Sequence, residues 1–338
     1  MDYVTIKDVA KRLNLAVSTI SRAFNDKYDI KKETKELILK TATEMGYHPN
    51  PMAKKLTQKR SFNIGIVVPE FINGFFPEVI IGAQEILFEK GYQVLITQSN
   101  ESYESEIKNV KTLVDNMVDG LIISLSSESK NTDYYQTLID KGFPIVFFNR
   151  VNSKLKSSKI LFNDYKWALF ATEHLITQGY KNIVHLEGLE SLTLSKERKR
   201  GFIDAHKKYK IELTSNHFIK SGFTIESGKA TAELMIKNNQ IPNAIFASCD
   251  PPAIGAMMVF KENGYKIPTD IAFVGFTESK LAGLINPPLT SVMQPTHDIG
   301  VEAAKMLLDQ IENPHAYLPQ TIILNGTLNI RESSVKII

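Results

Sequence analysis

The sequence predicts a small all-α head of about residues 1–48, followed by a larger α/β body with parallel sheets. Two observations predict this division. Apolar residues repeat at helical spacing in the head, whereas beyond Ser61 strand-length apolar runs alternate with helical stretches. The chain has 338 residues, which is too many for one ordinary core. We therefore expect two or three domains.

The composition is that of an ordinary soluble globular protein, with 43% apolar and 23% charged residues. No apolar stretch approaches the roughly 20 residues that span a bilayer, and the polar start of the chain lacks the apolar core of a secretory signal. We expect a cytoplasmic protein. The single cysteine, Cys249, excludes an internal disulfide and a thiolate metal cluster, and is interpreted as a buried small hydrophobe.

Positive charge is concentrated in the head. Residues 1–60 hold 13 Lys and Arg against 7 Asp and Glu, whereas the remaining residues hold 27 against 30. A basic head on a mildly acidic body indicates that the head meets a polyanion, because phosphate neutralisation supplies most sequence-independent DNA affinity. A solvated charged surface is the alternative, and charge alone does not decide between the two.

Three short amphipathic helices are predicted in the head. The first follows Thr5, which has Asp8 at the capping-box spacing, and the second follows a tight turn at residues 14–16. Two short helices joined by such a turn form a helix-turn-helix. A third helix runs from about residue 32 to residue 45. The three apolar stripes are Ile6, Val9, Ala10 and Leu13; Val17, Ile20, Ala23 and Phe24; and Leu37, Ile38, Ala42 and Met45.

The second helix of the head places three hydroxyls and a guanidinium on its outer faces. In a helix-turn-helix this helix lies in the major groove, where donors and acceptors meet base edges. The alternative is that Val17 only extends the apolar stripe and that the hydroxyls are plain surface. The basic charge of the head favours DNA binding. The predicted DNA contacts of the head are Thr5, Val17, Ser18, Thr19, Ser21, Arg22 and Asn25.

The sequence resembles the lactose and galactose repressor family of bacterial transcription regulators over nearly the whole chain. TIKDVAKRLNLAVSTISRAFN resembles the family's DNA-binding signature, GYHPNPMAKKL its linker, and AIGAMMVFKENGYKIPTDIAFVGF with PPLTSVMQP its effector-domain signatures. The family usually has Gly at position 14 and Ser at position 16. Asn14 can replace the glycine, but Ala16 cannot cap the recognition helix, so we expect a weaker helix start.

Residues 49–60 are predicted to be a hinge. Asn50 and Pro51 form a helix cap and first-position pair, and the basic segment that follows is too short to be a stable helix alone. The resemblance implies that two hinge helices of a dimer pair in the minor groove and insert Leu56 between base steps. A plain flexible tether is the alternative. The predicted DNA contacts of the hinge are Asn50, Ala53, Lys55 and Leu56.

Eight apolar runs of strand length follow Ser61, among them NIGIVV, GLIISL and IAFVGF. Runs of this kind, alternating with helices, favour parallel sheets covered on both faces. Four helices are predicted to stop at a glycine in the left-handed conformation, within EKGY, DKGF, TQGY and ENGY. We expect these glycines to be structural: Gly91, Gly142, Gly179 and Gly264.

The resemblance implies a body with two lobes of the periplasmic sugar-binding type. The first lobe would span about 61–161 and 290–320, and the second about 162–289 and 321–338. The chain would cross between them near Phe162, Pro288 and Gln320. Ligands of α/β sheets bind beyond the carboxyl ends of strands, so residues that follow the apolar runs should line a cleft.

This rule, together with the family match of Arg198, selects a candidate effector site. Each candidate has another interpretation: the phenylalanines as core packing, the arginines as surface ion pairs, and Asp250 as the cap of the next helix. The resemblance favours Asn149, Arg198 and Asp250 over these alternatives. The predicted effector-binding residues are Phe75, Phe76, Ser126, Asn149, Arg150, Arg198, Asp250 and Thr277.

Two residues of the predicted cleft depart from the sugar-binding members of the family. Asn149 and Thr277 stand where many members have Asp. Carboxylates accept paired hydrogen bonds, so losing two of them would leave Arg198 and Arg150 less compensated. We therefore hypothesise an effector with anionic character, such as a uronic acid or a sugar phosphate.

The sequence lacks P-loop, dinucleotide, zinc-protease and serine-hydrolase motifs, so we expect no enzymatic activity, cofactor or metal. We predict an effector-controlled transcription regulator, in the simplest case a repressor. A homodimer is expected on a near-palindromic double-stranded operator, because two-fold symmetry doubles the site that is read. The alternative is a solute-binding protein of the periplasmic type, which the head and the missing signal peptide disfavour.

Overall fold

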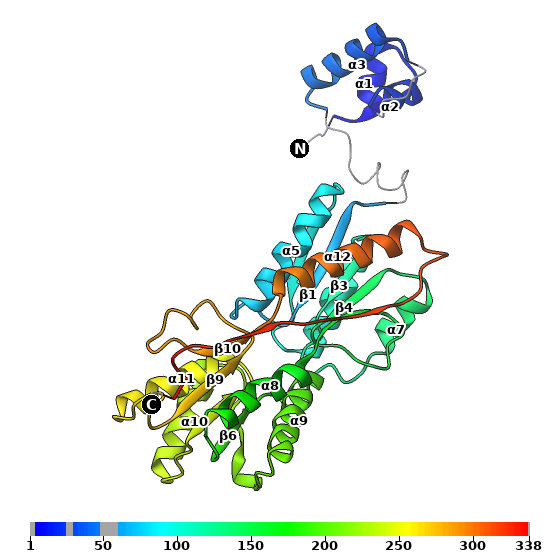
Figure 1. Cartoon of the computed structure of the whole chain (residues 1–338). Helices are drawn as coiled ribbons and strands as arrows, with labels where there is room; N and C mark the ends of the chain where they lie inside the picture. Colours follow the sequence, from blue (N-terminus) through cyan, green and yellow to red (C-terminus); the bar gives the residue numbers. More distant parts are fainter. Residues whose placement is uncertain (1–3, 25–29, 48–59, 337–338) are drawn as a thin grey trace. The chain divides into compact units, whose positions relative to one another are not determined.

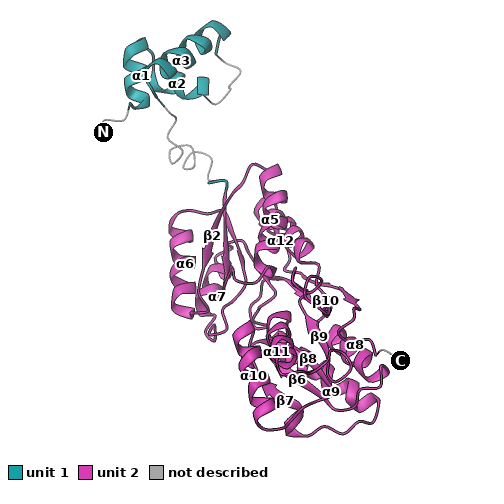
Figure 2. Ribbon diagram, turned by 90° about the vertical axis from the view of Figure 1, so that its left-hand side faces the viewer, with its two compact units in different colours: residues 1–62 teal, residues 63–338 magenta. Residues whose placement is uncertain are grey.

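The computed structural model describes residues 4–24, 30–47 and 60–336. The chain forms two compact units, Met1–Phe62 and Asn63–Ile338 (Figure 2). No helix among the described residues is long and apolar enough to cross a bilayer. Several predicted DNA contacts lie outside the described residues and remain predictions: Asn25, Asn50, Ala53, Lys55 and Leu56.

The first unit is helical. It contains α1 (Ile6–Leu13), α2 (Val17–Phe24) and α3 (Lys32–Glu44). Thr5 and Asp8 form the predicted capping box before α1: the Thr5 backbone nitrogen and hydroxyl donate to Asp8 Oδ2 at 2.8 and 2.6 Å. Asn14 ends α1 in the left-handed conformation, with φ of 53°. The tight turn predicted between the first two helices is therefore present.

The core of this unit is formed where the three helices meet. Val9, Ile20 and Ile38 come from α1, α2 and α3 respectively, and all three are fully buried. The prediction that Leu37 belongs to this core is wrong, because Leu37 is 52% exposed. The register of α3 turns Ile38 and not its neighbour toward the other two helices.

The second unit contains two six-stranded sheets, one in each lobe (Figure 1). The first-lobe sheet is parallel, with strand order β11-β5-β4-β3-β1-β2. Its strands are β1 (Asn63–Val68), β2 (Gln93–Gln98), β3 (Gly120–Ile123), β4 (Ile145–Phe148), β5 (Ser158–Phe162) and β11 (Thr321–Leu324). The helices of this lobe are α5 (Phe75–Glu89), α6 (Tyr103–Asp115), α7 (Asp133–Asp140) and α12 (Thr296–Glu312).

The second-lobe sheet has the order β12-β10-β9-β8-β6-β7, and only β12 runs antiparallel to its neighbour. Its strands are β6 (Ile183–Glu187), β7 (Phe218–Lys220), β8 (Ala244–Ala247), β9 (Ala272–Phe276), β10 (Thr290–Met293) and β12 (Thr327–Asn329). The helices are α8 (Asp164–Thr177), α9 (Thr193–Lys208), the 3₁₀ turn η1 (Ser215–His217), α10 (Ile225–Lys237) and α11 (Asp250–Glu262).

Strand pairing places the crossings between the lobes. The first crossing follows β5, which ends at Phe162. The second does not occur near Pro288, because β10 still pairs with β9, Thr290 lying opposite Val274. The third does not occur near Gln320, because β11 pairs with β5 in the first lobe. The chain therefore crosses between β10 and α12 and again between β11 and β12, several residues beyond both sequence predictions.

Each lobe contains one helix pair that packs through glycines. In the first lobe α5 and α12 lie side by side (Figure 1), and a Cβ on Gly82 or Gly300 would come within 2.1 or 1.9 Å of the facing backbone. In the second lobe Gly228 and Gly255 have the same role between α10 and α11. Because glycine has no side chain, the two helices of each pair can approach this closely.

The four predicted helix stops are confirmed. The glycines that follow α5, α7, α8 and α11 all have positive φ, between 77° and 91°. The aromatic residue after the first of them, Tyr92, donates its backbone N–H to the Leu87 carbonyl oxygen at 2.9 Å and is buried. At these stops the chain leaves the helix and enters the next strand at its amino end. The loops that build the site follow the opposite, carboxyl ends of the strands.

Candidate effector site and DNA-binding face

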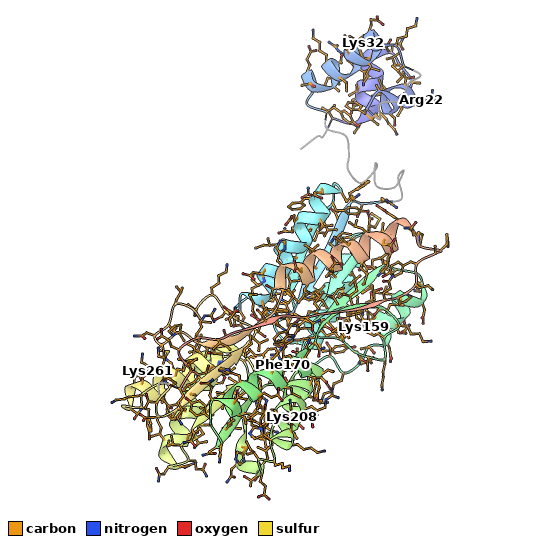
Figure 3. The ribbon with its side chains drawn as sticks, in the orientation of Figure 1. Arg22, Lys32, Lys159, Phe170, Lys208 and Lys261 are labelled. Carbon is orange, nitrogen blue, oxygen red and sulfur yellow. The ribbon has the colours of Figure 1, made fainter. Side chains whose placement is uncertain are left out.

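Helix α2 exposes the polar face that the sequence predicts for DNA contact. Val17, Ser18 and Arg22 are exposed, whereas Ile20 and Ala23 on the opposite side are buried. Arg22 projects from the head unit in Figure 3. Val17 is 41% exposed, which disfavours the interpretation that it only extends the core stripe.

The two remaining hydroxyls of α2 and the N-terminal threonine are placed differently. Thr19 and Ser21 are half-buried at the edge of the face. Thr5 is exposed, but its hydroxyl already donates to Asp8. The Ala16 carbonyl oxygen accepts from Thr19 N–H at 2.9 Å, so Ala16 stands where a capping side chain would be. The start of α2 therefore has no side-chain oxygen from residue 16 to satisfy its free N–H groups.

In the second unit, two contacts bring the lobes together. The Arg150 guanidinium of the first lobe lies 5.7 Å from the centre of the Phe223 ring of the second lobe. Lys280 Nζ of the second lobe lies 3.6 Å from Glu78 Oε1 of the first. We call the side chains gathered at the carboxyl ends of both sheets around these contacts the interlobe site.

Phe75 and Phe76 begin α5 at the first-lobe edge of this site. Their rings meet edge to face at 5.1 Å, and Phe76 also contacts Phe148 of β4 at 6.1 Å. Both are buried within the first-lobe core. Phe76 additionally lies 5.6 Å from the Arg150 guanidinium. The pair thus packs the core, and Phe76 also reaches the interlobe site.

Arg150 is held by a carboxylate from the loop after β2. Its Nη1 donates to Glu101 Oε1 at 2.6 Å, and only 8% of the Arg150 side chain is exposed. The second oxygen of Glu101 accepts the Ser127 N–H at 2.9 Å. Burial alone would raise the pKa of Glu101, but the Arg150 charge and these hydrogen bonds lower it below its usual value. The interpretation of Arg150 as a surface ion pair is wrong, since the pair is largely buried.

Ser126 belongs to a loop that is fixed from within. Its backbone N–H donates to the buried carboxylate of Glu106, and its hydroxyl lies 2.9 Å from that of Ser129. Glu106 also accepts from Tyr135 Oη at 2.6 Å. The polar groups of Ser126 are therefore already engaged, so its contribution is to hold the loop after β3.

Asn149 and Thr277 occupy equivalent places, directly after β4 and β9. Both adopt the left-handed conformation, with φ of 56° and 59°. This conformation is costly for Thr, whose side chain is β-branched. Both side chains are half-buried, and within the described chain neither makes a hydrogen bond. A backbone strained in this way is typical of ligand sites.

Arg198 is the most enclosed arginine of the site. Its Nη2 and Nε lie 2.7 and 2.8 Å from Asp164 Oδ1, and its Nη1 donates to the Ser248 carbonyl oxygen at 2.5 Å. Its guanidinium lies 4.0 Å from the centre of the Phe276 ring. The expectation that Arg198 and Arg150 are less compensated does not hold, because Asp164 and Glu101 pair with them. Sequence patterns did not reveal these two carboxylates.

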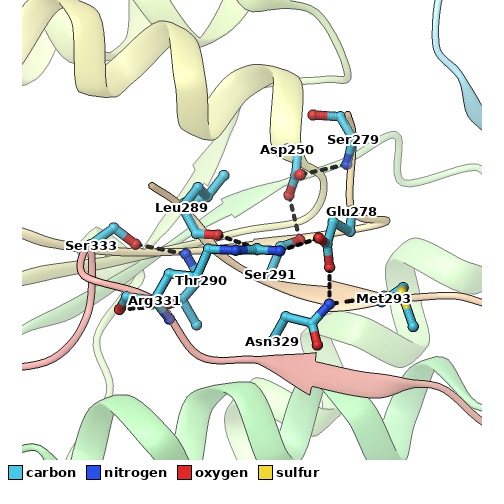
Figure 4. Close-up of polar contacts among 10 residues, drawn as sticks. All are labelled: Asp250, Glu278, Ser279, Leu289, Thr290, Ser291, Met293, Asn329, Arg331 and Ser333. Carbon is cyan, nitrogen blue, oxygen red and sulfur yellow. Dashed lines mark hydrogen bonds and ion pairs between the residues drawn. The ribbon is translucent and has the colours of Figure 1, made fainter. Parts of the chain in front are cut away.

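Asp250 ties α11 to two other segments of the second lobe (Figure 4). Its Oδ2 accepts the Ser279 N–H at 2.7 Å, and its Oδ1 accepts the Ser291 hydroxyl at 2.6 Å. Burial raises the pKa of Asp250 to about 7, although these hydrogen bonds act in the opposite direction. The cap interpretation is wrong, because α11 begins at Asp250 itself and the carboxylate bonds outside the helix.

Sequence reasoning missed several residues of the interlobe site. Phe223 and Asp164 lie in loops and helix starts where no pattern singles them out. Three others are buried and have polar side-chain atoms without a partner in the described chain: Ser195, Ser248 and Gln294. The strand-end rule could have found Ser248 and Gln294, which follow β8 and β10 directly.

The chain combines a helix-turn-helix unit with a two-lobed α/β unit, in which polar side chains gather where the lobes meet. This combination defines a DNA-binding regulator that also binds a ligand. Residues 5–50 match the family model described as bacterial regulatory proteins, lacI family, and residues 172–334 match the periplasmic binding protein-like domain. The chain belongs to the lacI family. It is 31% identical over 336 residues to the ribose operon repressor of Halalkalibacterium halodurans, with 98% of each chain covered.

Other relatives agree. A probable transcriptional repressor of Bacillus subtilis, ExuR, is 31% identical over 334 residues, with 98% of each chain covered. The solved transcriptional regulator CelR in complex with cellobiose is 27% identical, has a TM-score of 0.74 and covers 98% of this chain and 99% of its own. The lac repressor dimer bound to operator shares the fold, with a TM-score of 0.86 at 22% identity over 99% and 100% of the chains. The predicted fold class, family and DNA-binding regulatory function are confirmed.

Proposed function

We propose that this protein represses transcription by binding operator DNA through its head, under the control of a small molecule held in the interlobe site. The small-molecule part of this proposal rests on buried polar atoms that have no partner in the described chain. These atoms belong to Ser195, Ser248 and Gln294. Each such atom costs about 1–3 kcal/mol unless a ligand or water satisfies it. A solute-binding protein would need a similar site, but it would not need the lacI-family head.

An uncharged sugar suits the interlobe site best. The groups free for a ligand are mostly amides and hydroxyls, whereas Asp164, Glu101 and Asp250 are bonded within the protein. Amides and hydroxyls offer the donors and acceptors that sugar hydroxyls need. Two named relatives, a ribose operon repressor and a regulator solved with cellobiose, are consistent with this class. An acidic sugar would bring negative charge to a site whose two arginines are already paired.

We infer a homodimer from an exposed apolar surface on the first lobe. Helix α5 exposes Ile81 and Phe88, and the neighbouring edge strand β2 exposes Leu95 and Ile96. An apolar surface that includes an unpaired strand edge requires a partner or another means of protection. A second copy of the chain is the simplest partner. The related lac repressor was solved as a dimer on its operator.

The head contacts named from the sequence remain proposals. We propose that α2 enters the major groove with Val17, Ser18 and Arg22 toward base edges and with Thr5, Thr19, Ser21 and Asn25 at the edges of the contact. The hinge contacts Asn50, Ala53, Lys55 and Leu56 would lie in the minor groove. This assignment places the protein in the bacterial cytoplasm, together with its operator, and gives it no enzymatic activity.

Capture of genomic fragments by the purified full-length protein, at one stated salt concentration, tests the proposal. The expected result is an enriched near-palindrome that an uncharged sugar releases. Recovery of fragments without a shared sequence would contradict operator binding. Release by acidic sugars alone would retain the repressor function and replace the effector class. Arg22→Ala provides a control, because loss of a base contact changes the recovered sequence whereas loss of a phosphate contact weakens all fragments equally.

A further inference from the structure

The first lobe contains a cavity at the end of its sheet that lies opposite the interlobe site. The cavity has a volume of about 180 Å³, and Ile145 and Ser158, the first residues of β4 and β5, line it. Asn149 of the interlobe site follows the last residue of β4 instead. Strands of four and five residues separate the two places by roughly 15 Å. A ligand in this cavity, which we call the amino-end cavity, therefore does not compete for space with a ligand in the interlobe site.

The walls of the amino-end cavity are largely apolar and include two aromatic rings. Among the described residues, no aspartate or glutamate lines it. The larger apolar wall residues come from α7, from the segment before β4 and from the segment between α12 and β11: Ile139, Phe143, Pro144, Pro314, Tyr317 and Pro319. An apolar cavity of about 150 Å³ holds a benzene molecule. The amino-end cavity therefore has room for one ring-sized body with a small head group.

The polar side chains in the wall have hydrogen-bond donors left to offer. Ser157 lines the cavity and is 7% exposed, and its hydroxyl has no hydrogen-bond partner in the described chain. The hydroxyls of Ser158 and Tyr317 lie 2.5 Å apart, so they share one of their two protons and keep the other. The Gln310 amide oxygen accepts the Ile145 N–H at 3.1 Å, and its amide nitrogen uses one of two N–H groups on the Ile145 carbonyl oxygen. A ligand suited to this wall accepts hydrogen bonds.

Positive charge at the amino-end cavity favours an acceptor that is an anion. Lys156 lines the cavity, is exposed and forms no ion pair within the described chain. Behind the wall, Lys159 of β5 (Figure 3) is 9% exposed, and its Nζ donates to the carbonyl oxygens of Leu155 and Ser157 at 2.6 and 3.1 Å. This ammonium group has no carboxylate partner among the described residues, and burial lowers its pKa. Because buried charges are normally paired, a carboxylate in the cavity supplies the negative charge that the wall lacks.

We propose that the amino-end cavity is a second ligand site, which binds a small carboxylate with a ring-sized apolar body. The ring packs against Phe143, Tyr317 and the three prolines, while the carboxylate accepts from the Ser157 hydroxyl and the Lys156 ammonium group. A neutral amide of the same shape keeps the apolar contacts but loses the charge-assisted hydrogen bonds, which are roughly twice as strong as neutral ones. The site is separate from the interlobe site, so the proposal does not depend on the class of the effector bound there.

Calorimetry on the full-length protein tests the site with phenylacetate and with phenylacetamide, its neutral counterpart of nearly the same shape. Phenylacetate should bind with a Kd below about 1 mM, and about tenfold more tightly than the amide. Ser157→Ala removes the free hydroxyl and should weaken phenylacetate binding about fivefold. The same variant should not lower the melting temperature, because within the described chain the hydroxyl has no hydrogen bond to lose.

A pair of charge reversals locates the bound carboxylate. Lys156→Glu should weaken phenylacetate binding at least about tenfold. Lys154→Glu makes the same change at an exposed residue that does not line the cavity, and should change the affinity less than about twofold. Because both lysines are exposed, both variants should fold, and their melting temperatures check this.

Three results overturn the proposal. The first is phenylacetate that does not bind the wild-type protein at about 10 mM. The second is equal weakening by the two charge reversals, which a general loss of positive charge explains. The third is binding that Lys156→Glu leaves unchanged, since the carboxylate then lies elsewhere, as with the arginines of the interlobe site. Operator capture reports on the repressor function separately.

Discussion

Arg198 and Asp164 form a buried ion pair that joins α9 to the first turn of α8. Asp164 Oδ1 lies 2.7 Å from Nη2 and 2.8 Å from Nε, and the two side chains are 3% and 10% exposed. The remaining partners of the guanidinium, the Ser248 carbonyl oxygen and the Phe276 ring, also belong to the second lobe. Arg198 is therefore fixed within the second lobe.

Asp164→Asn should destabilise the second lobe strongly. The substitution leaves the buried guanidinium without its charge partner, and removal of one member of a buried pair costs roughly 3–5 kcal/mol. Urea unfolding followed by the fluorescence of Trp167, the single tryptophan of the chain, measures the loss because this residue lies on α8. The control is Glu190→Gln, which breaks the exposed Lys220–Glu190 pair of the same lobe and should leave the free energy of unfolding nearly unchanged. Equal losses in the two variants would contradict the role assigned to burial.

Ala16→Ser should strengthen the start of the recognition helix. Ala16 occupies the cap position of α2 and its carbonyl oxygen accepts from Thr19 N–H, so a serine hydroxyl there would reach the free N–H groups of the first turn. The expected gain is about 1 kcal/mol. Hydrogen exchange of the α2 amides in the full-length protein should slow about fivefold. Ala16→Val supplies no side-chain oxygen, ranks with alanine as a poor cap and serves as the control. Unchanged exchange in the serine variant would show that another group already satisfies the helix start.

The sequence predicted those features of the fold and site that depend on local rules. Asn14 and the four helix-stop glycines follow from left-handed backbone preferences, and Asn149 and Thr277 directly follow β4 and β9, as the pattern of apolar runs indicates. Partners were not predictable, because they depend on tertiary packing: Asp164 and Arg198 are 34 residues apart, and Glu101 and Arg150 are 49 apart. The argument for an anionic effector loses its premise at this point, since it counted the carboxylates absent from strand ends and could not count Asp164 and Glu101, which pair with the two arginines.

Leu56→Ala should weaken binding to the specific operator more than binding to random DNA. In the proposed hinge, the leucine side chain wedges between base steps, and unstacking is compensated only where the deformed sequence permits extra contacts. Truncation should lower specific affinity at least tenfold and change non-specific affinity less than twofold, as measured by fluorescence anisotropy at one salt concentration. Lys55→Met is the comparison, since loss of a phosphate contact should weaken both kinds of binding and reduce the salt slope by about one. Parallel losses in Leu56→Ala would remove the wedge assignment.

Ile81→Glu should weaken the proposed dimer. Ile81 is 56% exposed on α5, beside the edge strand β2. A carboxylate at this position would be buried in the dimer interface among apolar side chains, which is costly. Sedimentation equilibrium should show a dissociation constant at least a hundredfold higher than that of the wild-type protein, which corresponds to about 3 kcal/mol. Phe170 on α8 is also exposed, and Phe170→Glu should leave association unchanged. A wild-type protein that sediments as a monomer at micromolar concentration would contradict the interface.

The stability of the second lobe should depend on pH through His185. Its ring stacks against those of Phe246 and Phe202, whose centres lie 4.9 and 5.3 Å away, and burial lowers its pKa from 6.5 to about 4. Between about pH 4 and pH 6.5 the folded protein therefore binds fewer protons than the unfolded chain. This histidine thus lowers the free energy of unfolding as the protein is acidified through that range. The buried carboxyl of Asp250 acts in the opposite sense, because its pKa is raised to about 7.

The difference between the wild-type protein and His185→Phe separates the two effects. The phenyl ring can keep the stacking, while the variant lacks the titrating imidazole. Relative to the variant, the wild-type protein should lose on the order of 3 kcal/mol of unfolding free energy between pH 7 and pH 4, at 1.36 kcal/mol per pKa unit. Urea unfolding followed by Trp167 fluorescence measures this difference within the same lobe. A difference that does not change with pH would mean that the imidazole is protonated in the folded protein and that its stacked environment does not exclude the charge.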